Sequence, residues 1–353
     1  MSLRVVHWGT GSTGMHGLRA IIEHPDLELV GVHVYSADKV GRDAGELCGL
    51  PRTGVIATND LAATLDLEAD CLSYMANGVG RETAAIDDVV PFLERGTSVV
   101  TCSLIPFVFA AIAPPEMVDA VSAACTKGRS SFFNSGIDPG FATGQMVASL
   151  LALATEIESV RVQELGNFSR YGAAPIMRDV FGFGQPPSFV PPLFTSGMLL
   201  HWWKGTIAEI ADLLDIHIDD IVLRHDVATV DHDVECAFGR VEAGTIGAVR
   251  FELQGMVDGR PVVVVEHVDR IALDAGPQWD RQTTTEGTAY RLVVTGRPSY
   301  TCELGFSLAG GVSGAVISTA TYLVNAIASV CAAEVGVLGS RDLPPFVGRR
   351  SRV

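Results

Sequence analysis

Apolar, strand-like runs alternate with helix-like stretches over the first 140 residues of the chain. In residues 13–24, for example, Met15, Leu18, Ile21 and Ile22 recur at the spacing of an amphipathic helix. The runs that have the length and composition of buried strands are residues 3–8, 27–35, 55–57, 71–75, 98–102 and 131–134. This alternation predicts an α/β fold with a Rossmann-type, doubly wound parallel sheet that has helices on both faces.

The pattern changes after residue 142. A Gly/Pro-rich stretch at 171–192 and a helical run at 199–214 precede a series of alternating, strand-like runs. Those runs are residues 221–230, 235–243, 246–256, 261–271 and 288–295. We therefore predict a dinucleotide-binding domain at 1–142 and a second α+β domain at 143–315 that carries an open, mainly antiparallel sheet and binds the substrate. The C-terminal segment, 316–353, is expected to pack back on the first domain.

Composition and charge narrow the function classes. Hydrophobic residues make up 48% of the 353 residues and charged residues only 19%, which favours a well-packed core and a subunit interface. The formal net charge of −16 would repel phosphate backbones and anionic lipid, so we expect no nucleic-acid or membrane partner. Seven scattered cysteines without CxxC spacing, and a first strand that begins at residue 3, predict a cytoplasmic protein. The apolar segment 317–338 is interrupted by polar residues and is interpreted as a buried helix.

A glycine-rich motif follows the first predicted strand and precedes the first predicted helix. It consists of Gly9, Thr10, Gly11, Ser12, Thr13 and Gly14. In such a loop the first glycine permits a tight turn, the second lets the backbone approach a pyrophosphate, and the third lets the helix pack close to the strand. The helix N-terminus then donates N–H groups to the phosphates. These six residues are therefore predicted to bind a dinucleotide.

The end of the second predicted strand bears on the choice between NAD and NADP. An NAD-binding protein places an Asp or Glu there on the ribose, whereas residues 33–36 read His-Val-Tyr-Ser. Ser36 followed by the cations Lys39 and Arg42 matches a site for the 2′-phosphate, so we predict NADP(H) in preference to NAD(H). In the alternative, both cations are solvated and Asp38 binds the ribose. Further cofactor contacts are expected at the ends of the fourth and sixth strands, from Ala76, Asn77 and Pro139.

Three further segments carry groups suited to a catalytic or substrate site. Residues 134–141 read NSGIDPGF and place the Asp138 carboxylate and the Phe141 ring at the end of the sixth strand. Tyr171 opens the Gly/Pro-rich stretch, and His267 ends a strand-like run as a titrating group. Each also has a structural interpretation, as a turn-capping Asp, packed aromatic rings and a hydrogen-bonded core His. A group of His and acidic residues at 225–235 suggests metal ligands, but alternate strand residues point to opposite faces, so no metal is expected.

Taken together, these motifs resemble the NAD(P)-dependent 2,4-diaminopentanoate dehydrogenase and native amine dehydrogenase family. The resemblance rests on the glycine motif, the NSGIDPGF turn, KVGRDAGELCGL at 39–50, FGFG at 181–184, EHVDR at 266–270 and NAIASV at 325–330. The N-terminal half is also similar to dihydrodipicolinate reductase. The resemblance implies a Rossmann domain, a homodimer paired through the open sheet of the second domain, and a substrate pocket between the domains. It also implies hydride transfer between the nicotinamide and an imine or amine carbon, with ammonia taken up or released.

One position departs from the family pattern. The family has a Glu after a Thr-Cys pair at the end of the fifth strand, where it handles the ammonium proton, whereas this chain has Ser103. A serine hydroxyl is a poor general base near neutral pH without activation. The resemblance places Phe141, Tyr171 and His267 in the substrate cavity. Asp138, where the family has Asn, is a candidate for the missing carboxylate.

These residues define one leading interpretation and three alternatives. The catalytic candidates are Ser103, Asp138, Tyr171 and His267. The leading interpretation is an NADP-preferring oxidoreductase that acts on a C=N or C=O carbon of a small molecule. The substrate is expected to be fairly apolar because of the aromatic residues Phe181, Phe183, Phe189, Trp202 and Trp203. The first alternative is an amine dehydrogenase in which Asp138 supplies the missing carboxylate. The second is a ketone or aldehyde reductase without ammonia chemistry, in which Tyr171 or His267 donates the proton. The third is a catalytically inactive sensor that binds NADPH.

Overall fold

The computed structural model describes residues 2–78, 80–309 and 312–348. Internal contacts divide the chain into two compact units. The first unit contains residues Met1–Phe141 and returns at Val316, and the second contains Ala142–Ala315.

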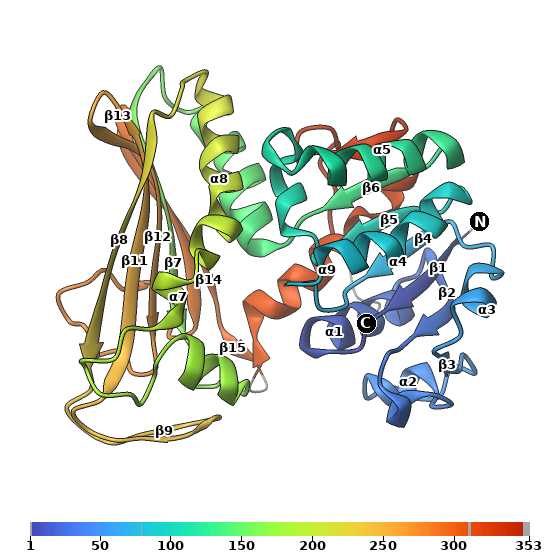
Figure 1. The fold of residues 1–353 in the computed structure, drawn as a ribbon, viewed down its shortest axis with the longest axis horizontal. Helices are drawn as coiled ribbons and strands as arrows, with labels where there is room; N and C mark the ends of the chain where they lie inside the picture. Colours follow the sequence, from blue (N-terminus) through green and yellow to red (C-terminus); the bar gives the residue numbers. More distant parts are fainter. Residues whose placement is uncertain (1, 79, 310–311, 349–353) are drawn as a thin grey trace. The chain divides into compact units, whose positions relative to one another are not determined.

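A seven-stranded sheet forms the centre of the first unit, in the order β17-β6-β5-β4-β1-β2-β3 (Figure 1). Every neighbouring pair is parallel. The strands are β1 Leu3–Trp8, β2 Leu27–His33, β3 Ala57–Thr58, β4 Cys71–Tyr74, β5 Ser98–Thr101, β6 Ser131–Asn134 and β17 Gly336–Leu338. This is the predicted Rossmann-type sheet, with one more strand, β17, added beside β6.

Helices cover both faces of this sheet, because the strands are apolar on both sides. Val6 packs with α4 and α5 on one face, whereas the neighbouring Val5 packs with α1 and α9 on the other. The helices are α1 Ser12–Glu23, α2 Ala44–Leu47, α3 Leu61–Leu65, α4 Glu82–Glu94, α5 Pro115–Gly128 and α9 Gly314–Cys331, with the short turns η1 Ala37–Lys39, η2 Ile105–Ile112 and η3 Ile137–Gln145.

Helix α9 is long and apolar enough, by length and composition alone, to cross a bilayer. Leu323 and Ile327 on this helix are fully buried against Val5 and Phe133 of the sheet. A core helix has the same composition as a membrane span when it is packed in this way. The burial of these side chains agrees with a core helix over residues 317–331, whereas residues 336–338 of the predicted helical segment form strand β17.

The second unit is built on a six-stranded sheet in the order β14-β13-β7-β12-β11-β8. All neighbouring strands are antiparallel except β7 and β12, which are parallel, so the predicted mainly antiparallel sheet is confirmed. The strands are β7 Glu156–Asn167, β8 Asp220–Thr229, β11 Ile246–Val257, β12 Arg260–Arg270, β13 Thr288–Arg297 and β14 Tyr300–Phe306. The remaining elements are α6 Met146–Leu151, η4 Ile176–Val180, α7 Pro192–Thr195, α8 Met198–Leu214, β9 Val234–Cys236, β10 Gly239–Val241, β15 Leu308–Ala309 and β16 Val312–Ser313.

The two faces of this sheet differ in chemistry. Val160 and Val162 belong to the apolar core, which also contains buried side chains of α8, such as Ile207. Arg161 lies between the two valines and therefore points to the other face, where its guanidinium binds the carboxylate of Glu266 at 2.6 Å. The second face is thus polar, with its charges paired.

One predicted strand is wrong. Residues 235–243 form a separate hairpin of β9 and β10, in which Val234 pairs with Val241. Gly239 adopts a φ of +106° at the start of β10, a backbone conformation that residues other than glycine rarely adopt. The chain therefore turns at a point where the apolar alternation predicts a continuous strand.

Candidate functional site

The glycine loop joins β1 to α1 in the first unit, and its three glycines have different roles. Gly9 has a φ of +102°, and a Cβ on it would lie 2.7 Å from the backbone N of Ala76. A Cβ on Gly14 would collide with the carbonyl oxygen of Gly9. Gly11, in contrast, is exposed and has no neighbouring atom within 4 Å of such a Cβ. The first and third glycines are therefore required by packing, and the second leaves the open space that a pyrophosphate needs.

A buried histidine supports this loop from beneath. The His7 Nε2 atom donates to the carbonyl of Gly9 at 2.7 Å, and its Nδ1 lies 3.2 Å from the hydroxyl of Ser73. Burial lowers the pKa of His7 to about 4, so the ring is neutral near pH 7. The sequence analysis did not identify His7, because a His within an apolar strand has no pattern that separates it from other core residues.

The structure brings one of the predicted 2′-phosphate cations to the glycine loop. The Lys39 ammonium donates to the Thr10 carbonyl at 2.9 Å and to the Thr10 hydroxyl at 3.1 Å. Ser36 precedes η1, the short turn that ends at Lys39, and is exposed. Arg42 is also exposed and is held through its backbone carbonyl, which accepts from the Ala57 amide at 2.9 Å. A positive charge therefore lies on the loop that was predicted to bind phosphate.

A second cation near the end of β2 was not predicted. The Arg81 guanidinium lies 5.1 Å from the centre of the Tyr35 ring, in a cation–π contact. The Tyr35 hydroxyl donates to Asp88 of α4, and the Tyr74 hydroxyl donates to the same carboxylate at 2.7 Å. Arg81 precedes α4 and is far from β2 in the sequence, so only the folded chain brings it to this strand end.

Ser103 has a structural contact next to the glycine loop. It is 6% exposed, and its hydroxyl donates to the Ala76 carbonyl at 2.5 Å. A Cβ on Gly78 would collide with the Ser103 carbonyl, so the loop after β4 packs tightly on this residue. Asn77, which lies between Ala76 and Gly78 in the sequence, is exposed. The Ser103 hydroxyl thus holds Ala76, whose amide nitrogen lies against Gly9.

The turn at residues 134–141 is fixed by backbone hydrogen bonds and by α9. The Ile137 amide donates to the Thr319 hydroxyl of α9 at 3.3 Å, and the Phe141 ring lies 5.5 Å from that of Tyr322. Asp138 and Pro139 are half-buried within this turn. The C-terminal helix therefore positions the segment that carries three of the predicted site residues, Asp138, Pro139 and Phe141.

In the second unit, His267 lies on β12 directly opposite Glu164 on the parallel strand β7. The His267 Nδ1 atom is 3.9 Å from a Glu164 carboxylate oxygen. The imidazole is 3% exposed, stacks on Phe251 at 4.7 Å and meets the Trp203 ring edge-on at 4.3 Å. An ionisable ring next to a carboxylate in an apolar setting is suited to moving a proton. The sequence analysis predicted His267 but not Glu164, because their pairing depends on the strand register.

Tyr171 lies in the same unit, after β7. Its ring is half-buried and packs edge-on against Phe168 at a centroid distance of 5.9 Å. Burial raises the pKa of its hydroxyl, so the group stays protonated near neutral pH. Tyr171 and His267 thus belong to the second unit, whereas Ser103, Asp138 and Phe141 belong to the first.

The His and acidic residues at 225–235 do not converge as a group. Among the described residues, Asp231 and His232 from this segment come together with Asp274, their ligand atoms lying within 4.8 Å of one another. All three are exposed, and the His232 Nδ1 atom is 2.7 Å from the Asp231 carboxylate. Exposed acidic groups of this kind are common on protein surfaces without a metal.

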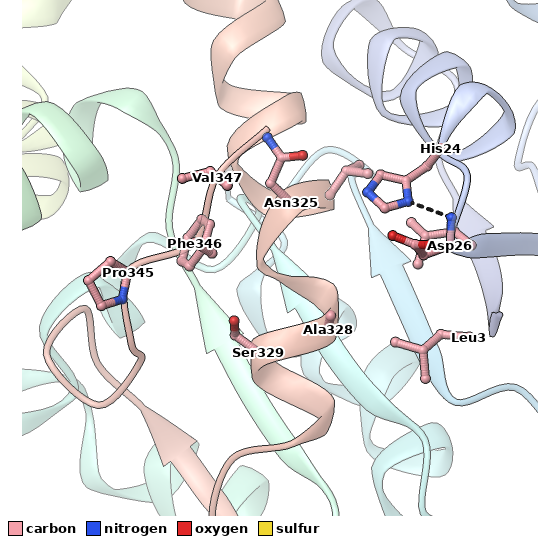
Figure 2. A pocket seen from close by; sticks show the side chains of 11 residues that line it. Leu3, His24, Asp26, Asn325, Ala328, Ser329, Pro345, Phe346 and Val347 are labelled. Atoms are coloured by element: carbon pink, nitrogen blue, oxygen red, sulfur yellow. Dashed lines mark hydrogen bonds between the residues drawn. The ribbon is translucent and has the colours of Figure 1, made fainter. Parts of the chain in front are cut away.

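Figure 2 shows a cavity of about 560 Å³ at the amino-terminal edge of the first unit's sheet. Leu3 and Leu27, which begin β1 and β2, contribute to its wall together with Asn325 and Ser329 of α9. The glycine loop follows the carboxyl end of β1. The cavity and the predicted dinucleotide site therefore lie at opposite edges of the sheet.

The fold and the glycine loop define a two-unit protein whose first unit has a Rossmann-type fold. The family model of the 2,4-diaminopentanoate dehydrogenase C-terminal domain matches residues 141–348. An amine dehydrogenase from Streptomyces virginiae is 36% identical over 356 residues, which cover 99% of each chain. The chain therefore belongs to the 2,4-diaminopentanoate dehydrogenase and amine dehydrogenase family and is an oxidoreductase, as the sequence motifs predicted.

Two further comparisons agree with the predicted architecture. The structure of an amine dehydrogenase from Mycobacterium smegmatis shares the fold, with a TM-score of 0.77 at 20% identity, and the match covers 99% of this chain and 98% of that one. A 4-hydroxy-tetrahydrodipicolinate reductase from Synechococcus elongatus is 43% identical over 63 residues, which is 18% of this chain and 23% of the reductase. The predicted similarity to dihydrodipicolinate reductase is thus confirmed over a short region.

Proposed function

We propose that the protein is an NADP(H)-preferring oxidoreductase that transfers a hydride to or from a C=N or C=O carbon of a small, fairly apolar molecule. The observation that carries the proposal is the contact of the Lys39 ammonium with Thr10 of the glycine loop, at 2.9 Å and 3.1 Å. The nicotinamide, when bound, supplies or accepts the hydride. The residues of this chain bind the cofactor, orient it and handle the accompanying proton.

Cofactor binding rests on groups that are already in place. The space at Gly11 accommodates the pyrophosphate, and the N-terminus of α1 donates amide groups to it. Lys39, which contacts the glycine loop, and Arg81, which lies on Tyr35 near the end of β2, would supply positive charge for the 2′-phosphate. Ser36, three residues before Lys39, would be a further hydrogen-bond donor. The Asp88 carboxylate accepts from two tyrosines, so it is already engaged and is not a free ribose ligand.

Proton transfer is assigned to the second unit. The Glu164 carboxylate and the His267 imidazole face each other at 3.9 Å, so either can take a proton that the other releases. The Ser103 hydroxyl already donates to the Ala76 carbonyl and has no base beside it that would activate it among the described contacts. Asp138 remains the candidate of the first unit, and Tyr171 the candidate neutral proton donor.

The apolar substrate follows from the surroundings of His267. Phe251 and Trp203 cover the imidazole, and the rings of Phe168 and Tyr171 pack together at the start of the Gly/Pro-rich segment. A charged or strongly hydrated substrate would lose its water among these rings without replacement hydrogen bonds. A ketone, aldehyde or imine with a hydrocarbon body has little bound water to lose and would not incur this cost.

The second candidate is a ketone or aldehyde reductase that does not use ammonia. It is favoured by Ser103, which stands where the family has its acid and which acts here as a packing residue. A third possibility, a sensor that binds NADPH without catalysis, requires the same cofactor contacts and no turnover.

One assay separates these candidates. NADPH and NADH oxidation is measured with a panel of apolar ketones and aldehydes, with and without ammonium. The proposal predicts oxidation of NADPH faster than of NADH. Dependence on ammonium indicates amine formation, and its absence indicates the carbonyl reductase. A folded protein that binds NADPH but oxidises it with none of the substrates would contradict the enzymatic proposal and support the sensor.

The proposal includes a cytoplasmic homodimer that pairs through the sheet of the second unit. Its polar face carries Arg161, Arg250, Glu252 and Glu266 in mutual ion pairs, which neutralise the charges that a second copy would cover. All seven cysteines are free, in keeping with a reducing compartment. Light scattering should give twice the chain mass, and an Arg250→Glu variant should shift the protein toward the monomer. A wild-type mass of one chain would contradict the dimer.

A further inference from the structure

The cavity of about 560 Å³ in Figure 2 lies outside the cofactor and proton-handling residues. Its floor is the face of α9 that carries Asn325, Ala328 and Ser329, three residues of the NAIASV motif. Asn325 and Ser329 are four residues apart, so they lie on the same face of the helix, one turn or about 6 Å apart. Ala328 contributes only a methyl group, which leaves space above the helix.

Two polar side chains of this floor have no hydrogen-bond partner within the described part of the chain. They are the Asn325 amide and the Ser329 hydroxyl, and both residues are half-buried. A serine or threonine inside a helix often donates its hydroxyl to the carbonyl four residues earlier, as Thr321 does to Ile317 at 3.1 Å. Since Ser329 makes no such bond among the described contacts, both groups can bind a molecule in the cavity.

The two walls of the cavity differ in chemistry. On one side of α9, Figure 2 shows His24 and Asp26, which belong to the connection between α1 and β2. On the other side it shows Pro345, Phe346 and Val347. The Asp26 amide donates to the His24 Nδ1 atom at 3.2 Å, which fixes the connection, and Asp26 is exposed. A molecule that spans the cavity therefore meets a carboxylate at one end and an apolar, aromatic surface at the other.

This arrangement favours a small cation with an apolar body. A carboxylate has about four lone-pair sites, so Asp26 can accept from a ligand in addition to its own contacts. The side-chain oxygens of Asn325 and Ser329 are further acceptors, and a primary ammonium group has three donors for them. The net charge of −16 attracts a cation and repels an anion. The volume of the cavity is within the range of about 300–1,000 Å³ that small-molecule sites have.

Aromatic contacts connect the apolar wall to the turn at residues 134–141. The Phe346 ring lies 5.0 Å from the ring of Tyr322 on α9, and the Tyr322 ring lies 5.5 Å from that of Phe141. All three residues belong to the first unit. A molecule that packs against Phe346 therefore touches the first of three rings, the last of which is a predicted substrate residue.

We propose that this cavity binds a small primary amine with an apolar body. The ammonium group donates to Asp26, with Asn325 and Ser329 as further acceptors, and the body packs against Phe346. The bound amine changes the environment of Phe141 through the ring of Tyr322. The cavity and the glycine loop lie at opposite edges of the sheet, so the amine does not compete with a dinucleotide for space. This binding is independent of the proposed enzymatic function, and a protein without turnover should still show it.

The test titrates the full-length protein, without dinucleotide, with three molecules of similar shape and different charge. These are benzylamine, benzyl alcohol and benzoate, and calorimetry measures their affinities. Benzylamine should bind with a Kd on the order of 1 mM, as expected for a ligand of so few atoms. Benzyl alcohol should bind at least about tenfold more weakly, because it lacks the charge, and benzoate should not bind. Equal affinities for the three molecules would overturn the proposal.

A charge-neutralising variant tests the role of the carboxylate. Asp26→Asn should weaken the binding of benzylamine about tenfold and leave that of benzyl alcohol unchanged. Asp119→Asn is the matched control, because Asp119 is an exposed carboxylate on α5, which packs on the other face of the sheet. It should bind benzylamine as the wild type does. Unchanged benzylamine affinity in Asp26→Asn would overturn the proposal, and the three-ligand series in the wild type decides even where a variant fails to fold.

NMR of the wild type locates the bound amine. The resonances of Asn325, Ser329 and Phe346 should shift on addition of benzylamine, and that of Phe141 should follow with the same concentration dependence. Shifts confined to Tyr171 and His267 would place the amine in the second unit and overturn the proposal. A Phe141 resonance that stays unchanged at saturation would overturn the connection through Tyr322.

Discussion

Each unit contains a buried histidine, and the two are used in different ways. In the first unit, His7 makes two hydrogen bonds, to the Gly9 carbonyl and to the Ser73 hydroxyl, and burial lowers its pKa to about 4. In the second unit, His267 lies among aromatic rings with the Glu164 carboxylate 3.9 Å away. The first histidine is a neutral support for a backbone loop. The second lies beside a carboxylate, and the proposed function has it exchange a proton with that group.

This difference shows how the two units contribute to function. In the first unit, the proposed cofactor surface consists of backbone amides and glycines, and side chains such as His7 and Ser103 hold that backbone in place. In the second unit, the proposed proton transfer depends on Glu164 and His267, which neighbouring strands bring together. Changes to the first unit should therefore affect cofactor binding or stability, and changes to the second should affect turnover.

The largest effect is expected at the glycine loop. Gly11→Val fills the space that the pyrophosphate needs, so NADPH affinity should fall by more than about 10³-fold, or about 4 kcal/mol. The fold should survive, because no atom lies within 4 Å of a Cβ at this position. Gly172→Val is the matched control, since Gly172 has equally open surroundings in the other unit and should leave NADPH affinity unchanged in calorimetry. Unchanged affinity in folded Gly11→Val would contradict the cofactor site.

The support from His7 predicts a pH dependence of stability. The pKa of His7 in the folded state, about 4, lies below the ordinary histidine pKa of 6.5, so the unfolded chain binds the proton more tightly. The contribution of His7 to the free energy of unfolding is therefore fully present above pH 6.5. It is lost as the pH decreases toward 4, by about 3 kcal/mol in total. Denaturant titrations at several pH values in this range should show that the free energy of unfolding changes less with pH in His7→Asn than in the wild type. The same pH dependence of the unfolding free energy in both proteins would mean that His7 does not cause it.

The proton-handling pair should affect turnover and not cofactor binding. Glu164→Gln keeps the shape of the side chain but removes its basicity, so kcat should fall by about 10²-fold, at the lower end of general acid–base contributions. NADPH affinity should stay as in the wild type. Tyr171→Phe is the comparison, and the assignment to Glu164 and His267 predicts that it has little effect on kcat. The reverse result would move the proton donor to Tyr171 and favour the carbonyl reductase.

Cofactor preference should depend on Lys39. Lys39→Ala should weaken the binding of NADPH by about 1.5 kcal/mol or more, the contribution of a charged hydrogen bond. The binding of NADH should stay nearly unchanged. Arg81→Ala and Arg42→Ala, measured in the same way, show which second cation contributes. Equal losses for NADPH and NADH in Lys39→Ala would mean that Lys39 only holds the glycine loop.

The smallest effect is expected for Ser103. Ser103→Ala removes the hydrogen bond to the Ala76 carbonyl, which should cost about 1 kcal/mol of unfolding free energy. The value of kcat should not change, because the hydroxyl acts only through this structural hydrogen bond. A large loss of kcat with normal stability would instead give Ser103 a role in catalysis.

The sequence predicts the first unit better than the second, for a physical reason. A parallel sheet buried on both faces produces uninterrupted apolar runs, and a glycine loop requires glycines at fixed positions, so both are visible locally. Lys39 was predicted because it closely follows β2. Arg81 and Glu164 were missed because helix packing and strand register, which no local pattern records, bring them to Tyr35 and His267.

The central claim is that the first unit binds NADPH in preference to NADH. The most direct test is a calorimetric titration of the wild-type protein with each dinucleotide at the same ionic strength. The account predicts that NADPH binds at least about tenfold more tightly, a difference of about 1.4 kcal/mol. Tighter binding of NADH, or equal binding of both, would contradict it.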